Sequence, residues 1–186
     1  MTRTHEIRPD LDEGIDRKVL SQLRARFLKL NEGRMARAME GLSTRQQGVL
    51  TLLPLFFHVN HPLLPGYVSG STPAGLSNYE PDADVLAEAQ RLTRSFSYKP
   101  RHGSNPPRPI HGLFLMGSLG TLAQADQSDM DVWVCHAAGL AEWALAELRR
   151  KCQLLEAWAA RLGAEAQLFM IEPQAINIGE RDGQLS

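Results

Sequence analysis

GLFLMGSLGTLAQADQSDMDVWVC, residues Gly112–Cys135, contains two apolar runs separated by a Gly-Ser pair and a polar connection. The first run, Leu113–Met116, is typical of a buried strand. Gly117 follows it and allows a sharp turn. A second strand opens at Asp129, after the polar connection. Strand, turn, connection and strand in this order predict the centre of an α/β core.

The Gly117-Ser118 pair has the residue types of an anion-binding turn. Glycine lets a phosphate approach the backbone closely, and serine adds a hydroxyl donor beside the exposed amides. No Gly-Lys-Ser/Thr follows, which excludes a Walker A loop, and GSLG lacks the spacing of a dinucleotide fingerprint. We therefore expect a small phosphate site at Gly117 and Ser118.

Two acidic side chains open the second strand. Because side chains alternate between faces along a strand, Asp129, Asp131 and Trp133 are predicted to point the same way. Neighbouring carboxylates repel each other and resist burial, and a divalent cation relieves both effects. Mg²⁺ suits the pair, since it binds carboxylates together with water and substrate phosphates. Glu172, which ends a third strand predicted over residues 164–172, is expected to add a third carboxylate if the strands are neighbours.

The composition is that of a globular protein of moderate size, with 186 residues, 43% hydrophobic and 22% charged. Its net charge of −1 argues against an extended nucleic-acid-binding surface, so a nucleotide would be held locally. The most apolar run, residues 49–59, contains Pro54 and is too short to span a bilayer. The N-terminus lacks the apolar segment of a signal peptide, and the two cysteines have no zinc spacing. A cytoplasmic location is expected.

The chain is predicted to divide into a helical part (1–96), a Pro-rich linker or covering loop (97–111), an incomplete α/β core (112–173) and a disordered tail (174–186). Apolar residues recur at helical spacing from Asp12 to Leu42 and are expected to pack into the core, with a break near Asn31 and Gly33. Another helix, over residues 139–162, precedes the third strand. The fold class is α+β, with helices followed by a mixed sheet of at least three strands.

Gly117-Ser118 and Asp129-x-Asp131 resemble the site pattern of the DNA polymerase beta-like nucleotidyltransferase superfamily. Three longer segments resemble the N-terminal catalytic region of bacterial class I adenylate cyclases: LSTRQQGVLTLLPLFFHVNHPLLPGYV, MGSLGTLAQADQSDMDVWVCH and RRKCQLLEAWAARLGAEAQLFMIE. The resemblance covers nearly the whole chain apart from its ends, and after Pro173 the sequence is expected to depart from the family. Because family members are much longer, the chain resembles a truncated catalytic region.

The resemblance implies conversion of ATP to 3′,5′-cyclic AMP and pyrophosphate with Mg²⁺ as cofactor. Asp129 and Asp131 would bind the metal and carry catalysis, Gly117 and Ser118 would hold the β- and γ-phosphates, and Glu172 would stand where relatives have aspartate. The ribose 3′-hydroxyl would attack the α-phosphorus within the same molecule. Regulation by the sugar phosphotransferase system would act through a C-terminal region of the longer relatives.

Two other functions remain open on these residues. The same fold could transfer AMP to a hydroxyl of a protein, an RNA or a small molecule, in which case no cyclic AMP would form. Alternatively, the DxD pair could be structural and the chain a non-catalytic binding module whose N-terminal helices serve partners.

Overall fold

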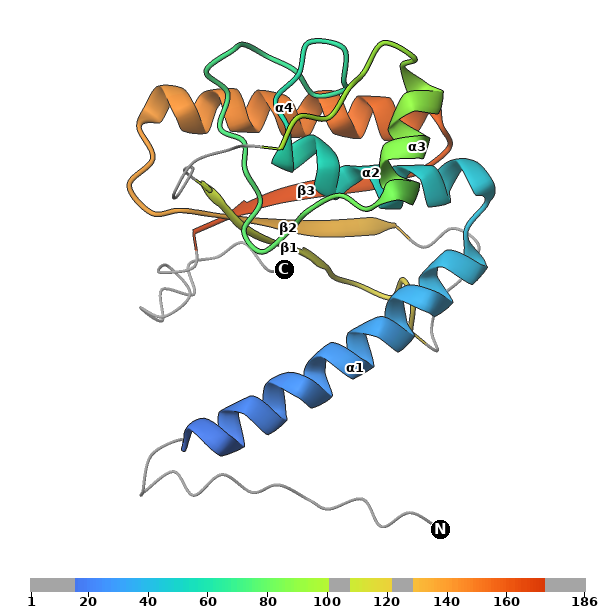
Figure 1. The fold of residues 1–186 in the computed structure, drawn as a ribbon, viewed down its shortest axis with the longest axis vertical. Helices are drawn as coiled ribbons and strands as arrows, with labels where there is room; N and C mark the ends of the chain where they lie inside the picture. The colour runs from blue at the N-terminus through green and yellow to red at the C-terminus, as the bar shows by residue number, and fades with distance from the viewer. Residues whose placement is uncertain (1–15, 101–107, 122–128, 173–186) are drawn as a thin grey trace.

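The computed structural model describes residues 16–100, 108–121 and 129–172. These ranges contain helices α1 (Arg17–Gly41), α2 (Thr44–His58), α3 (Ala83–Leu92) and α4 (Glu142–Arg161), and strands β1 (Ile110–Leu115), β2 (Met130–His136) and β3 (Ala166–Ile171). The predicted α+β class is confirmed, because a helical N-terminal part precedes a mixed sheet of three strands (Figure 1). The expected disordered tail lies outside the described residues, and the expected domain boundaries stay predictions.

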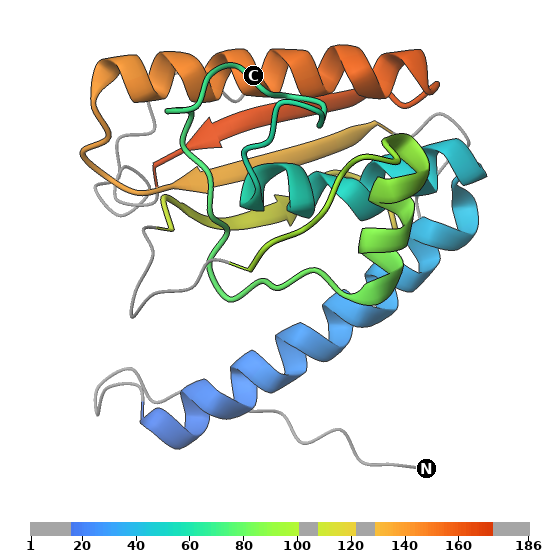
Figure 2. The same cartoon turned by 45° about the horizontal axis from the view of Figure 1, so that its top comes forward.

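The sheet has the order β1-β2-β3, with β1 antiparallel and β3 parallel to β2. Parallel neighbours need a crossover connection, and α4 provides it between β2 and β3. Helices α2 and α4 lie on one face of the sheet (Figures 1 and 2). An isolated bridge joins Leu76 to Ile110 of β1, so the long segment after α2 touches the edge of the sheet. The two helices and the sheet therefore enclose the core.

Helix α2 begins with a capping box formed by Ser43 and Gln46. The Ser43 side chain accepts from the Gln46 amide, and the Gln46 side chain accepts from the Ser43 amide. The helix continues through Pro54 without being divided. Its Phe56 is fully buried and packs edge-on against Trp158 of α4, with ring centroids 5.1 Å apart. This contact joins the two helices above the sheet.

Helix α1 departs from the sequence prediction in two ways. It runs unbroken through Asn31 and Gly33, because a glycine inside a helix costs only about 1 kcal/mol, which neighbouring residues offset. Core packing of its apolar stripe was also predicted, and this is wrong for the N-terminal part, where Leu30 is 73% exposed and Phe27 53%. At the C-terminal end the prediction is confirmed, because Met39 packs against the core. Within α1, whose residues are all described, only Ala38 is buried. The N-terminal half extends away from the sheet (Figure 1).

Among the helices of the described segments, none combines the length and apolar character that crossing a bilayer requires.

Candidate functional site

The Gly-Ser turn and the acidic pair come together because β1 and β2 are antiparallel neighbours. Directly after β1, the Met116 amide donates to the Asp131 carbonyl at 2.7 Å. The chain then turns: the amide and the hydroxyl of Thr121 donate to the Ser118 carbonyl at 2.9 and 2.6 Å. Gly117 opens this turn with a φ of +70°, a conformation that glycine adopts at low cost. We call residues 117–121 the glycine turn.

The Asp131 carboxylate lies directly against the glycine turn. A Cβ added to Gly117 would lie 3.1 Å from Asp131 Oδ2, closer than ordinary van der Waals contact. The hydrogen atom of glycine therefore leaves room that any side chain would fill. Gly117 and Asp131, which the sequence predicts to act together, therefore lie side by side.

Strand β2 has the predicted alternation. Met130 and Val132 are buried, whereas Asp131 and Trp133 are partly exposed, so the aspartate lies on the face opposite the core. Within the described residues no ion pair or hydrogen bond involves the side chain of Asp129 or Asp131. The Asp131 carboxylate beside the glycine turn, with Asp129 two residues earlier in the chain, is a donor set that fits a divalent cation. No group of three His, Cys, Asp or Glu in these ranges is gathered closely enough to hold a metal by itself.

The expected position of Glu172 is wrong. Because β3 is parallel to β2, Gln167 lies beside Asp131, and Ile171 lies beside Cys135. Glu172 follows Ile171, so it is five residues beyond Gln167, which is about 16 Å along the strand. The strands are neighbours, as the prediction required, but their direction puts Glu172 at the opposite end of β2 from the aspartates.

Glu165 is the acidic residue that the register brings to the same end of the sheet as the aspartates. The first pair of the parallel ladder is Met130 with Ala166, and the Met130 amide donates to the Glu165 carbonyl at 2.8 Å. Asp129 and Glu165 therefore precede neighbouring strands at the same edge of the sheet. A signal for this was present in the sequence, since a strand, helix and strand in succession predict parallel strands.

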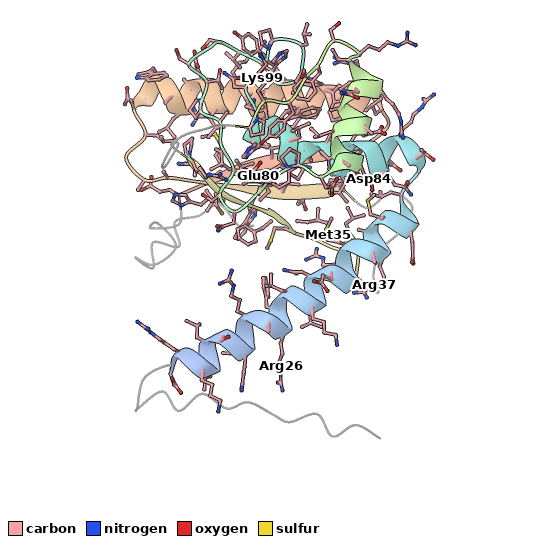
Figure 3. All side chains as sticks on the ribbon, viewed as in Figure 1. Arg26, Met35, Arg37, Glu80, Asp84 and Lys99 are labelled. Carbon is pink, nitrogen blue, oxygen red and sulfur yellow. The ribbon has the colours of Figure 1, made fainter. Side chains whose placement is uncertain are left out.

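Two arginines of α1 hold the glycine turn from its other side, and sequence analysis missed both. Arg34 Nε donates to the Leu119 carbonyl at 2.9 Å, and its Nη2 donates to the carbonyls of Met116 at 3.0 Å and Gly117 at 2.9 Å. Arg37 Nε donates to the Gly120 carbonyl at 3.0 Å. Figure 3 shows Arg37 on the end of α1 that approaches the body of the protein. The contacts join residues more than 80 positions apart, so no local sequence pattern predicts them.

Gly120 brings the backbones of the turn and of α1 into direct contact. Its φ is +74°, and an added Cβ would overlap the Arg34 carbonyl oxygen. The arginine contacts thus form across an interface without space for an intervening side chain.

An aromatic row crosses the sheet on the same face as Asp131. Trp133 is the register partner of Phe114 on β1 and of Phe169 on β3. Phe114 and Phe169 are each more than 40% exposed. This is the face opposite α2 and α4, so the acidic pair adjoins an open, apolar surface.

Comparison with known proteins found one matching family model and several similar relatives. A family model described as the adenylate cyclase NT domain matches residues 19–186. The chain is 39% identical over 158 residues to proteins named adenylate cyclase from Salmonella typhimurium and from Escherichia coli K12, and 36% identical over 154 residues to one from Proteus mirabilis. Each match covers 82% of this chain and 18% of the relative. No solved structure matches the chain.

The family match corrects one expectation from the sequence. It continues to residue 186, so the likeness does not stop at Pro173 as predicted. The chain spans less than a fifth of the length of these curated relatives. A match over residues 19–186, together with 39% identity to several relatives, leaves one conclusion: the chain belongs to the adenylate cyclase NT domain family.

Proposed function

We propose that this chain carries the nucleotide site of an adenylate cyclase, which converts ATP to 3′,5′-cyclic AMP and pyrophosphate. The observation that carries the proposal is the contact of the Asp131 carboxylate with Gly117. It brings a turn suited to phosphate next to one carboxylate of an acidic pair suited to a cation. Membership of the family supplies the reaction, because the similar relatives are named adenylate cyclase.

In this proposal each group of the site has one role. Backbone amides of Gly117 and Ser118, with the Ser118 hydroxyl, bind the β- and γ-phosphates of ATP. Asp129 and Asp131 hold Mg²⁺, and Glu165 at the same edge adds negative charge. When bound, Mg²⁺ neutralises phosphate charge and lowers the pKa of a nearby hydroxyl.

The chain contributes to the reaction chiefly by orienting ATP. Gly117 is exposed and Ser118 partly so, which lets a triphosphate reach the turn from solvent. Fixing the β- and γ-phosphates there restrains the α-phosphate and brings the ribose 3′-hydroxyl to it, since both belong to one molecule. Prior alignment of this kind replaces entropy that the transition state would otherwise lose. Fixed amide dipoles also stabilise the charge that develops on the leaving pyrophosphate.

Product analysis with α-labelled ATP and Mg²⁺ tests the proposal, using the chain itself and a longer protein that contains it. Cyclic AMP is expected as the labelled product. Replacing both acids, Asp129→Asn and Asp131→Asn, should lower its formation at least about a hundredfold, because the cation loses its charged ligands. Asp84→Asn is the matched control, since Asp84 is an exposed aspartate on α3 (Figure 3).

Two results would overturn parts of the proposal. Turnover within about twofold of wild type in the double variant would refute the assignment of the acidic pair. An adenylated hydroxyl acceptor without cyclic AMP would keep the site and change the reaction to AMP transfer.

A further inference from the structure

We propose that Arg34 is a positioning residue for phosphate binding: it fixes the glycine turn so that the turn's amides face the nucleotide. The inference rests on the phosphate-binding part of the proposed function and adds a residue to it. The guanidinium group of Arg34 donates to three backbone carbonyls, those of Met116, Gly117 and Leu119.

Peptide geometry connects these carbonyls to the opposite side of the turn. In a trans peptide unit the C=O and the following N–H point in opposite directions. Holding the Met116 and Gly117 carbonyls toward Arg34 therefore directs the amides of Gly117 and Ser118 away from α1. Both of these amides belong to residues assigned to phosphate. Arg34 thus orients the donors that a phosphate needs while it contacts only the acceptors.

Arginine is suited to this role for a geometric reason. Its planar fork presents several N–H groups at fixed angles, whereas lysine offers one compact ammonium. Here Nε and Nη2 bind carbonyls on both sides of Ser118, so they span the turn. Arg34 is partly buried, which strengthens hydrogen bonds from a charged donor. Arg37 supports the same turn with a single bond to Gly120.

The glycine turn also meets the backbone of α1 directly. Gly120 lies so close to α1 that an added Cβ would overlap the Arg34 carbonyl oxygen. The helix backbone therefore limits how far the turn can move inward, and the guanidinium limits how far it can move outward. Together they predict a turn whose shape is set before phosphate arrives, which lowers the entropic cost of binding.

The test measures binding of inorganic tripolyphosphate with Mg²⁺ to the 186-residue chain by calorimetry, alongside urea unfolding of each variant. Arg34→Ala should weaken binding about tenfold or more, as expected for loss of charged hydrogen bonds. Arg34→Lys should fall between Arg34→Ala and wild type. Adding guanidinium at millimolar concentration should restore part of the binding to Arg34→Ala and leave wild type unchanged. Arg24→Ala, an exposed arginine on the same helix, is the control and should bind as wild type does.

Each outcome decides the matter. Binding by folded Arg34→Ala equal to wild type would overturn the inference, and so would absence of tripolyphosphate binding by wild type. Should Arg34→Ala unfold, equal binding by Arg34→Lys and wild type would overturn it instead. If the affinities follow the expected series but no cyclic AMP forms from ATP, Arg34 remains a positioning residue and the cyclase reaction is refuted.

Discussion

Replacing Gly120 by alanine tests the contact between α1 and the glycine turn. Two costs arise: a left-handed φ disfavours alanine by about 1–2 kcal/mol, and the new Cβ overlaps the Arg34 carbonyl oxygen. Forcing an extra carbon into a packed site adds about 1–3 kcal/mol. The overlap cost cannot exceed the free energy with which α1 docks, because detaching the helix relieves the overlap. We expect Gly120→Ala to lose about 3 kcal/mol in urea unfolding.

Gly139→Ala separates the two costs. Gly139 has a φ of +70°, and an added Cβ would meet nothing within 4 Å. It therefore carries the conformational cost without the overlap. The two variants should differ by about 2 kcal/mol, or roughly 4–8 °C in melting temperature for a chain of this size. Equal losses would refute the close contact between α1 and the turn.

Three further changes test the core, a helix cap and a buried charge. Phe56→Ala should cost about 3–5 kcal/mol in urea unfolding, because it empties a fully buried site beside Trp158, whereas exposed Phe27→Ala should stay within about 0.5 kcal/mol. Ser43→Ala should cost about 1 kcal/mol through loss of the capping box of α2. Burial lowers the pKa of Lys151 to about 8, from 10.5; charged Lys151 therefore destabilises the fold at pH 7. Lys151→Met should be more stable at pH 7 by up to about 3 kcal/mol. This gain should shrink between pH 8 and 10.5, because over that range Lys151 is neutral in the folded state but still charged in the unfolded state. Urea unfolding of both proteins at pH 7 and pH 10 measures the difference.

The sequence predicted those parts of the fold that depend on local patterns. Helix α4 and strands β2 and β3 follow from apolar periodicity, and the meeting of Gly117 with Asp131 follows from the order of strand, turn and strand. Core packing of the N-terminal half of α1 was wrongly predicted, because periodicity shows which residues share a helix face and not what covers that face. Among the described residues, Leu30 and Phe27 find little to pack against.

The site was predictable only in part, for a physical reason. Spacing along one strand places Asp131 relative to Asp129, but a third carboxylate comes from another strand and depends on its direction. The prediction of Glu172 did not take account of the crossover helix, which makes β3 parallel and puts Glu165 at the same end as the aspartates. The role of Arg34 could not be predicted from the sequence, because its partners lie 82 to 85 residues away. Those partners are backbone carbonyls, which carry no sequence signature.

The attachment of α1 also sets an order of events in folding. Strands β2 and β3 and the helix between them occupy one short stretch of chain, whereas the Arg34 bonds close a loop of 85 residues. Longer loops cost more entropy to close, so we expect α1 to dock after the sheet has formed. A helix with one buried residue is also expected to detach by local opening, well below the free energy of global unfolding. Hydrogen exchange should then show early exchange in α1 together with the glycine turn, while β2 stays protected.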